Sequence, residues 1–511
     1  MDASTSSNLL FQGSDWNFER ISRAYDAIEE IALEELKLDV YPNQLEIISS
    51  EQMLDAYSSV GMPLMYQHWS FGKRFVFEEH HYRKGYRGLA YELVINSNPC
   101  ITYLMEENTM AIQALVTAHA SFGHNHFFKN NYLFRRWTDA GAILSYMDFA
   151  KKYIARCEER HGTAAVESIL DSAHALMDQG VFRYRRPPRL SSEQERERIR
   201  EKLEYEEQSY NDLWRTLPPS AREGEPDGKD ENASERKKAL KLPEENLLYF
   251  LEKNSLVLEP WQREILRIVR VIAQYFYAQR QTKVMNEGCA TFVHYYIMNR
   301  LFDLGKIDEG TMLEILQSHS NVVFQPDFDD PRYPGLNPYA LGFAMMQDIQ
   351  RISTEPTSED EHWFPDFAGT GDWREVMLDA WENHRDESFI LQYLSPAVIR
   401  RFRLFRLTDD ATEPYCEIAS IHNERGYQEV RAALARSYDV GVNLPDIQVS
   451  DVNMLGDRHL RLQHNVKNGV LLEERSRDET LRHIRRLWGY DVSLVGREAG
   501  SERLLYECSA Q

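Results

Sequence analysis

The spacing of apolar side chains predicts that most of the chain is helical. Apolar residues recur every three or four positions, which is the period of an α-helix, in five stretches: 15–57, 109–122, 137–177, 259–280 and 286–304. Asn108 or Thr109 is placed to cap the second stretch and Asn286 the last, because short polar side chains accept hydrogen bonds at a helix start. Pro338 marks the first turn of a further helix, since its fixed backbone angle suits that position.

Two runs of strand-forming residues, 89–95 and 100–105, lie directly before the helix 109–122. The residues between them, Asn-Ser-Asn-Pro, favour a tight turn. The pattern therefore predicts a β-hairpin that leads into this helix.

From residue 410 the pattern changes to alternating strands and helices. Short runs rich in β-branched and aromatic residues alternate with two amphipathic helical stretches, in the order βαββαββ. This order predicts a ferredoxin-like βαββαβ fold with one extra strand. We therefore expect an α+β protein that is mostly helical, with a separate C-terminal α+β domain at 410–511.

The helical part, residues 15–405, contains one segment that is too polar to pack. Residues 218–241 have almost no apolar side chains, so they cannot bury enough surface to offset the entropy of ordering. We predict a disordered insertion there. Residues 1–14 include Leu-Phe-Gln-Gly-Ser, and we interpret them as a tag or as a disordered N-terminus.

Charge and composition disfavour several classes of function. The formal net charge of −22 disfavours binding to nucleic acids or to an anionic membrane surface, since both select basic proteins. No apolar run is long enough for a transmembrane helix. The N-terminus lacks the features of a signal peptide and the five cysteines are scattered, which indicates a cytoplasmic protein with reduced thiols. No Walker A, GxGxxG or GxSxG motif points to a nucleotide site or a serine hydrolase.

Four side chains of metal-ligand type fall on predicted apolar helix faces or at a helix end, where an unpaired polar group is costly. His119 and His124 are five residues apart, and a regular α-helix would set them about 140° apart. They can converge only if the helix ends or bulges near Gly123. Glu287 and His294 are seven residues apart, which is two helical turns, so they share one face of their helix.

These residues predict a divalent metal site, with zinc as the first choice, held by His119, His124 and Glu287. His294 is expected as a fourth ligand or as a partner of a ligand. Zinc peptidases usually have two histidines four apart with a general-base Glu after the first, whereas this spacing is longer and Ala120 follows. The order of hairpin, histidine helix and distant glutamate is that of zincin peptidases, an analogy at the level of fold. A structural histidine cluster and a buried ion pair remain the alternatives.

Glu106 and Glu107, at the end of the hairpin, are the candidates for the missing general base. Either carboxylate could hold a water molecule beside the metal. The alternative is that both only complement the dipole of the helix that follows. The pattern alone leaves both roles open.

Several long segments are specific enough to compare with known families. They include YSSVGMPLMYQHWSFGK, YELVINSNPCITYLMEENT, AHASFGHNHFFKNNYLFRRWTDA, RQTKVMNEGCATFVHYYI and IHNERGYQEV. Together they resemble the stage V sporulation protein R (SpoVR) family, over most of the chain from residue 15 to the C-terminal domain. The family element H-A-x-x-G-H-N falls on residues 119–125, and N-E-G-x-A-x-F-x-H-Y falls on 286–295. Cys289 stands where the family pattern leads us to expect Trp, a difference that touches no proposed ligand.

The resemblance implies a physiological setting but no reaction. SpoVR proteins are linked to spore-cortex formation and to stationary-phase or stress physiology. The partners that the resemblance implies are a PrkA-type serine protein kinase and a von Willebrand-like protein. Two functions stay open: a zincin-like, metal-dependent hydrolase of peptide or amide bonds, and a non-catalytic adaptor or regulatory protein that acts with the kinase.

Overall fold

The structure is a computed structural model, and it describes most of the chain. The described ranges are 8–58, 65–70, 92–183, 242–408, 417–420, 422–454, 456–467, 469–501 and 503–510, with a few single positions between them. The chain forms two compact units, Met1–Tyr153 with Ala278–Val440, and Ile154–Tyr277 with Gly441–Gln511. Most described residues are helical and the sheets are small. Within these ranges, no helix combines the length and the apolar content that crossing a membrane requires.

The structure describes part of one of the two segments that were expected to lack structure, and almost nothing of the other. Apart from Leu240, the insertion predicted at 218–241 lies outside the described residues. Residues 8–14, which belong to the segment expected to be a tag or disordered, are ordered and pack on the first unit. Leu10 and Phe11 are buried, and the backbone N–H of Leu10 donates a hydrogen bond to a carbonyl oxygen of the same unit. Their apolar side chains therefore belong to the fold.

The stretch predicted as one helix at 15–57 forms four elements, so that prediction is wrong. They are α1 (Phe18–Glu30), the π-helical turn η2 (Ile31–Glu35), β1 (Asn43–Ile48) and α2 (Ser50–Ser58). Lys37 adopts a left-handed backbone conformation, with φ 57°, after the helical residues end. β1 then pairs in parallel with β3 (Cys100–Met105) along its whole length. This pairing with a distant strand overrides the local apolar spacing.

The predicted hairpin is confirmed. β2 (Glu92–Ile95) runs antiparallel to β3, with Ile95 opposite Ile101. β3 is the central strand of a three-stranded sheet in the order β1-β3-β2. The sheet therefore ends directly before the helical segment that carries the two candidate histidines.

That helical segment passes through three parts in one continuous run. They are α4 (Met110–Thr117), the π-helix η3 (Ala118–His124) and α5 (Asn125–Asn130). Thr109 caps the run as predicted, because its side chain accepts a hydrogen bond from the Ile112 N–H. Every residue of α4 and η3 is buried, so the polar side chains there need partners inside the protein.

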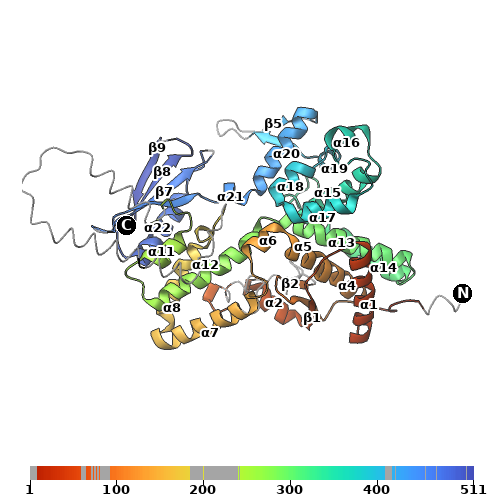
Figure 1. Cartoon of the computed structure of the whole chain (residues 1–511), viewed down its shortest axis with the longest axis horizontal. Helices are drawn as coiled ribbons and strands as arrows, with labels where there is room; N and C mark the ends of the chain where they lie inside the picture. The colour runs from red at the N-terminus through yellow and green to blue at the C-terminus, as the bar shows by residue number, and fades with distance from the viewer. Residues whose placement is uncertain are drawn as a thin grey trace, which may run out of the picture. The chain divides into compact units, whose positions relative to one another are not determined.

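Helix α13 (Lys283–Asp303) packs against η3 and α15 (Pro338–Thr354), and Figure 1 shows it running beside α4 and α5. α13 begins earlier than predicted, because the carboxylate of Asp386 accepts hydrogen bonds from the N–H groups of Val284 and Met285, both at 2.9 Å. Asn286 therefore lies inside the helix and does not cap it, which corrects the prediction.

Two glycines let α13 and α15 touch through their backbones. A Cβ atom built on Gly288 would lie 2.7 Å from the Cα atom of Gly342, and one built on Gly342 would lie 2.8 Å from the Cα atom of Gly288. Real Cβ atoms do not approach other atoms so closely, so a side chain at either position would push the helices apart.

The other helices complete the two units. The first unit also contains α6 (Tyr132–Trp137), α14 (Glu309–Val322), α16 (Ser358–Trp363), α17 (Trp373–Asn383), α18 (Asp386–Tyr393), α19 (Pro396–Arg401) and α20 (Glu424–Tyr438). The second unit contains α8 (Thr163–Ala175), the 3₁₀ turn η4 (Met177–Gln179), α11 (Leu247–Asn254) and α22 (Glu474–Trp488). The boundaries between the units fall at or within α7 (Ile143–His161), α12 (Pro260–Arg280) and α21 (Val440–Asn443).

The C-terminal strands and helices occur in the predicted order, but they do not form the predicted ferredoxin-like sheet. β6 (Ile447–Val452), β7 (Leu460–Val466), β8 (Val492–Glu498) and β9 (Leu504–Ser509) form one sheet in that order. β7 and β8 are parallel and connected through α22, which packs on β8. β5 (Glu417–Ser420), predicted as the first strand of the same sheet, pairs instead with β4 (Arg406–Thr408).

The helix that follows β5 explains this difference. α20 packs on α18 and α19 and belongs to the first unit, so the chain enters the four-stranded sheet only after residue 440. The apolar face of α20 finds its partner among the helices and leaves the sheet to α22. The independent folding of residues 410–511 stays a prediction.

Candidate metal centre

The π-helix η3 brings His119 and His124 together. A π-helix hydrogen-bonds each residue to the fifth one along, so side chains five apart lie on one face. The two imidazole rings have their centroids 4.6 Å apart, and the residues are only 4% and 7% exposed. The bulge that these histidines need in order to converge is therefore present, at the predicted place.

Gly123 allows this face to approach α13. A Cβ atom on Gly123 would lie 2.5 Å from the Cα atom of Ala290 and 2.9 Å from its Cβ atom. Because glycine has no Cβ, the π-helix and α13 come into backbone contact one turn from Glu287. The histidines and the glutamate are thus held by two helices in direct contact.

Glu287 closes the cluster. Its Oε2 atom lies 3.5 Å from His124 Nε2 and 4.0 Å from His119 Nε2, and the three ligand atoms all lie within 4.8 Å of one another. The same Oε2 atom is buried and has no hydrogen-bond partner. A buried carboxylate oxygen without a partner is costly, and a cation bound here would satisfy it.

The remote nitrogens of both histidines are oriented by α13. His124 Nδ1 lies 2.9 Å from Asn286 Oδ1, so it donates to the amide oxygen, and His119 Nδ1 lies 2.9 Å from His294 Nδ1. These contacts leave both Nε2 atoms facing Glu287. His294 lies behind His119, and both of its ring nitrogens contact other histidines, so its position is that of a partner of the proposed ligand His119.

The electrostatics of the cluster favour the neutral forms of His119 and His294. Burial and the nearby imidazoles of His124 and His294 hold the pKa of His119 well below its usual value. Burial and the imidazoles of His319 and His124 lower the pKa of His294 in the same way. A metal binds imidazole in its neutral form, so His119 needs no deprotonation to act as a ligand.

Glu92 is the residue of this site that the sequence did not reveal. Its Oε1 atom lies 3.7 Å from His119 Nε2, from the first position of β2. Burial, and then the nearby charge of Glu287, raise the pKa of Glu92 to about 8. The only local signal is a carboxylate at the start of the apolar run ELVI, which by itself is ambiguous.

Glu106 and Glu107, the predicted bases, are exposed at the end of β3. The backbone of Glu106 is tied to the N-terminal region: its N–H donates to the Ile48 carbonyl, and its own carbonyl accepts from Trp16 Nε1 at 2.8 Å. Among the described residues, no contact joins either carboxylate to the histidine cluster. The structure therefore brings Glu92, and not these two, to the candidate metal.

The donor set and its spacing fit zinc. Bonds of about 2.0–2.1 Å in a tetrahedral site hold neighbouring ligand atoms about 3.3–3.4 Å apart. The distances of 3.5 and 4.0 Å from Glu287 Oε2 to the two Nε2 atoms need only small side-chain movements to reach this spacing. Two imidazoles and one carboxylate are also the ligands of many catalytic zinc sites, which keep a further position open.

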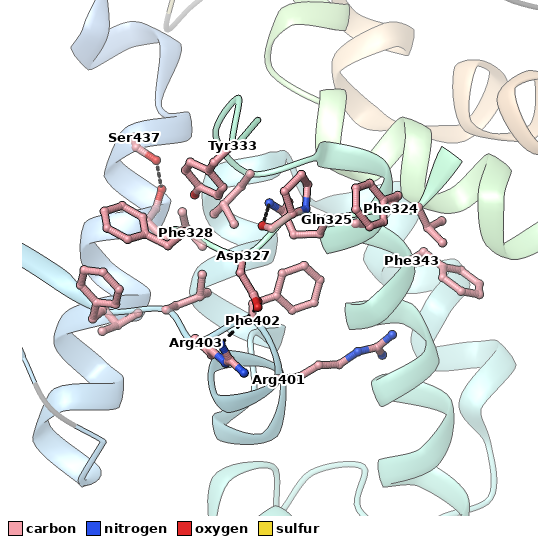
Figure 2. A pocket seen from close by; sticks show the side chains of 18 of the residues that line it. Phe324, Gln325, Asp327, Phe328, Tyr333, Phe343, Arg401, Phe402, Arg403 and Ser437 are labelled. Carbon is pink, nitrogen blue, oxygen red and sulfur yellow. Dashed lines mark hydrogen bonds and ion pairs between the residues drawn. The ribbon is translucent and has the colours of Figure 1, made fainter. Parts of the chain in front are cut away.

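The described cavities lie elsewhere in the first unit. One of about 650 Å³ is bounded by α15, α19, α20 and the loop before α15, and Figure 2 shows its aromatic walls, with Arg403 facing Asp327 at 3.3 Å. Another, of about 430 Å³, borders α13 at Tyr296 and Arg300. Neither is lined by a proposed ligand. The ligand geometry, and not a cavity, identifies the candidate site.

Comparison with known proteins places nearly the whole chain in one family. The family profile described as "SpoVR like protein" matches residues 15–443, and the one described as "SpoVR-like C-terminal domain" matches residues 445–499. A protein of Escherichia coli (strain K12), named "Uncharacterized protein YcgB", is 54% identical over 500 residues, which are 98% of this chain and 96% of that protein. No solved structure matches the chain. The matched range 15–443 includes His119, His124 and Glu287, and the names of these relatives state no reaction.

Proposed function

The chain belongs to the SpoVR family, and we propose that it is a metal-dependent hydrolase of a peptide or amide bond. His119, His124 and Glu287 are the proposed ligands, and zinc is the proposed metal. The chemistry belongs to cell-wall, spore-cortex or stationary-phase stress physiology, which is the setting of the family. The arrangement of hairpin, histidine helix and distant glutamate supports a zincin-like site by analogy of fold.

One observation carries this proposal. The Oε2 atom of Glu287 is buried, has no hydrogen-bond partner and faces the Nε2 atoms of His119 and His124. A cluster that served only packing would pair this oxygen with a donor, because an unpaired one destabilises the fold. A bound cation satisfies the carboxylate and both imidazole lone pairs at once.

Glu92 is the proposed proton-transfer group. This chain has Ala120 at the position where zinc peptidases have the general-base glutamate, and Glu92 is proposed to take over that role. Its carboxylate lies close to the proposed ligand His119 and is largely shielded from water. Its raised pKa, about 8, lies near neutral pH, which suits a group that both accepts and donates a proton during a reaction. A zinc ion at this site would supply a polarised carbonyl and a water of lowered pKa.

The test measures metal content and hydrolysis separately. Purified protein, stripped with chelator and reloaded with zinc chloride, should hold about one zinc per chain, and His124→Ala should hold far less. Glu92→Gln should keep the zinc and lose hydrolysis of peptide and muropeptide amide bonds by about 100-fold or more. Glu106→Gln is the matched control, because its carboxylate is exposed and outside the cluster. Wild-type protein without zinc after reloading would refute the proposal.

A second function rests on the closed surroundings of the cluster. His119 and His124 are nearly inaccessible, and neither described cavity reaches them. This favours a structural metal in a non-catalytic adaptor that acts with a PrkA-type serine protein kinase and a von Willebrand-like protein. Stoichiometric zinc without hydrolysis of any amide, together with normal kinase binding by Glu92→Gln, would favour the adaptor over the hydrolase.

A further inference from the structure

Three histidines from three helices form a hydrogen-bonded chain that begins at the candidate metal. We infer that metal binding reverses the direction of the hydrogen bonds in this chain, and that His294 and His319 thereby act as positioning residues for the ligand His119. This inference rests on the proposed metal site and concerns how that site is held.

The chain is continuous and buried. His119 Nδ1 on η3 lies 2.9 Å from His294 Nδ1 on α13, and His294 Nε2 lies 2.9 Å from His319 Nδ1 on α14. The three residues are 4%, 2% and 6% exposed, so water does not compete for these contacts. Each distance is that of a hydrogen bond, which requires one proton between the two nitrogens.

A neutral imidazole has one N–H donor and one lone pair, so each ring that donates on one side must accept on the other. A metal on His119 Nε2 occupies that lone pair and leaves the proton of the ring on Nδ1. His294 then accepts at Nδ1 and donates from Nε2, and His319 accepts at Nδ1. The proton positions on His294 and His319 therefore follow from the proton position on His119.

Without metal, the opposite direction also satisfies both contacts between the imidazole rings. His119 has one further hydrogen bond, to the backbone of Ala290. His319 Nδ1 then donates to His294 Nε2, His294 Nδ1 donates to His119 Nδ1, and His119 carries its proton on Nε2. That proton points towards the carboxylates of Glu92 and Glu287, which lie 3.7 and 4.0 Å away. The carboxylates at the inner end therefore favour this direction until a cation replaces the proton.

The outer end of the chain imposes no direction of its own. Among the described residues, the ring nitrogens of His319 have no hydrogen-bond partner other than His294. Its ring packs against the aromatic rings of Tyr295 and Phe343, the second of which also lines the larger cavity (Figure 2). His319 is thus held in place by packing and can carry its proton on either nitrogen.

The sharpest test reads the proton position at His319, the residue farthest from the metal. Nitrogen-15 NMR of the full-length, histidine-labelled protein distinguishes a protonated ring nitrogen from a bare one, and the spectrum of His319→Gln identifies the His319 signals. We expect the proton of His319 on Nδ1 in the metal-free protein and on Nε2 after zinc chloride is added. If zinc binds and the proton of His319 stays on the same nitrogen, the inference is overturned.

Two substitutions test the positioning role. Gln at position 319 keeps both an acceptor and a donor for His294, whereas Leu keeps neither. We expect His319→Leu to weaken zinc affinity by about 10-fold to 100-fold, as for other groups that orient a ligand, and His319→Gln to stay close to wild type. Equal zinc affinity in all three proteins refutes the positioning role. Absence of zinc binding by the wild type refutes the metal site itself, so the two failures are distinguishable.

Discussion

Replacing Glu287 by Gln should have effects of opposite sign with and without metal. In the metal-free protein, Glu287 Oε2 is buried without a partner, 3.5 Å from the Nε2 atom of His124. The amide of Gln removes the charge and provides an N–H donor for that nitrogen. The variant should therefore be at least as stable as the wild type when no metal is present.

The expected magnitudes follow from the surroundings of Glu287. A buried polar group without a partner costs about 1–3 kcal/mol. Because the side chain is 18% exposed, we expect the lower end, a gain of about 1 kcal/mol in the metal-free variant. With zinc at about 1,000 times its Kd, the wild type gains about 4 kcal/mol, and a variant with about 100-fold weaker binding gains only about 1.4 kcal/mol. The variant should then be less stable than the wild type by about 2 kcal/mol.

Urea unfolding measures both conditions on the same proteins, first with chelator and then with zinc. The free energy of unfolding is compared at equal m-values, so that a change in the denatured state is recognised. Glu107→Gln serves as the control, because its side chain is exposed and outside the cluster. A loss of stability of the same size in both conditions would show that Glu287 is only a buried structural charge, and the metal site would then be wrong.

Three further predictions address the frame that holds the site. Gly342→Ala should lower stability by about 1–3 kcal/mol and reduce zinc content, because its Cβ would clash with the Val284 carbonyl oxygen. The control Gly310→Ala, at an exposed glycine of α14, should change neither. Urea unfolding and metal analysis test both variants. Burial raises the pKa of Asp386 to about 7 in the folded protein. The stabilising contribution of its protonation is therefore complete below about pH 4 and lost as the pH rises through 7, and Asp386→Asn should flatten this part of the stability profile. Limited proteolysis should cut first within 218–241 and leave zinc content unchanged, because the three proposed ligands lie in one compact unit; loss of zinc on cutting would contradict this.

Elements that depend on local spacing could be predicted from the sequence. The hairpin β2-β3, the cap at Thr109 and the start of α15 at Pro338 each follow from a few neighbouring residues, and all three are present. Elements that depend on distant partners could not. β1 exists because β3 offers it a parallel edge, and α13 starts early because Asp386, about 100 positions away, binds its first N–H groups. The prediction of a ferredoxin-like sheet was wrong for the same reason, because α20 packs on other helices and not on the sheet.

The same division applies to the site. His119, His124 and Glu287 could be selected because polar groups on apolar helices need an explanation, and the structure brings them together. Glu92 could not be selected, because a single carboxylate at the start of a strand has no periodic pattern that sets it apart. His319 is likewise one imidazole on an ordinary helix, and only its distance from His294 gives it meaning.

The π-helix at residues 118–124 also explains why such a site escapes a search by motif. A scan for two histidines with three residues between them passes over this chain, because four residues separate His119 from His124. The extra residue is absorbed by the wider turn, and removing Ala120 would restore the common spacing in an α-helix. The spacing in the sequence thus differs from the common motif, although the two histidines still lie on one face of the helix. A pattern that allows four residues between the two histidines, with a glycine directly before the second, would find sites that the strict spacing misses.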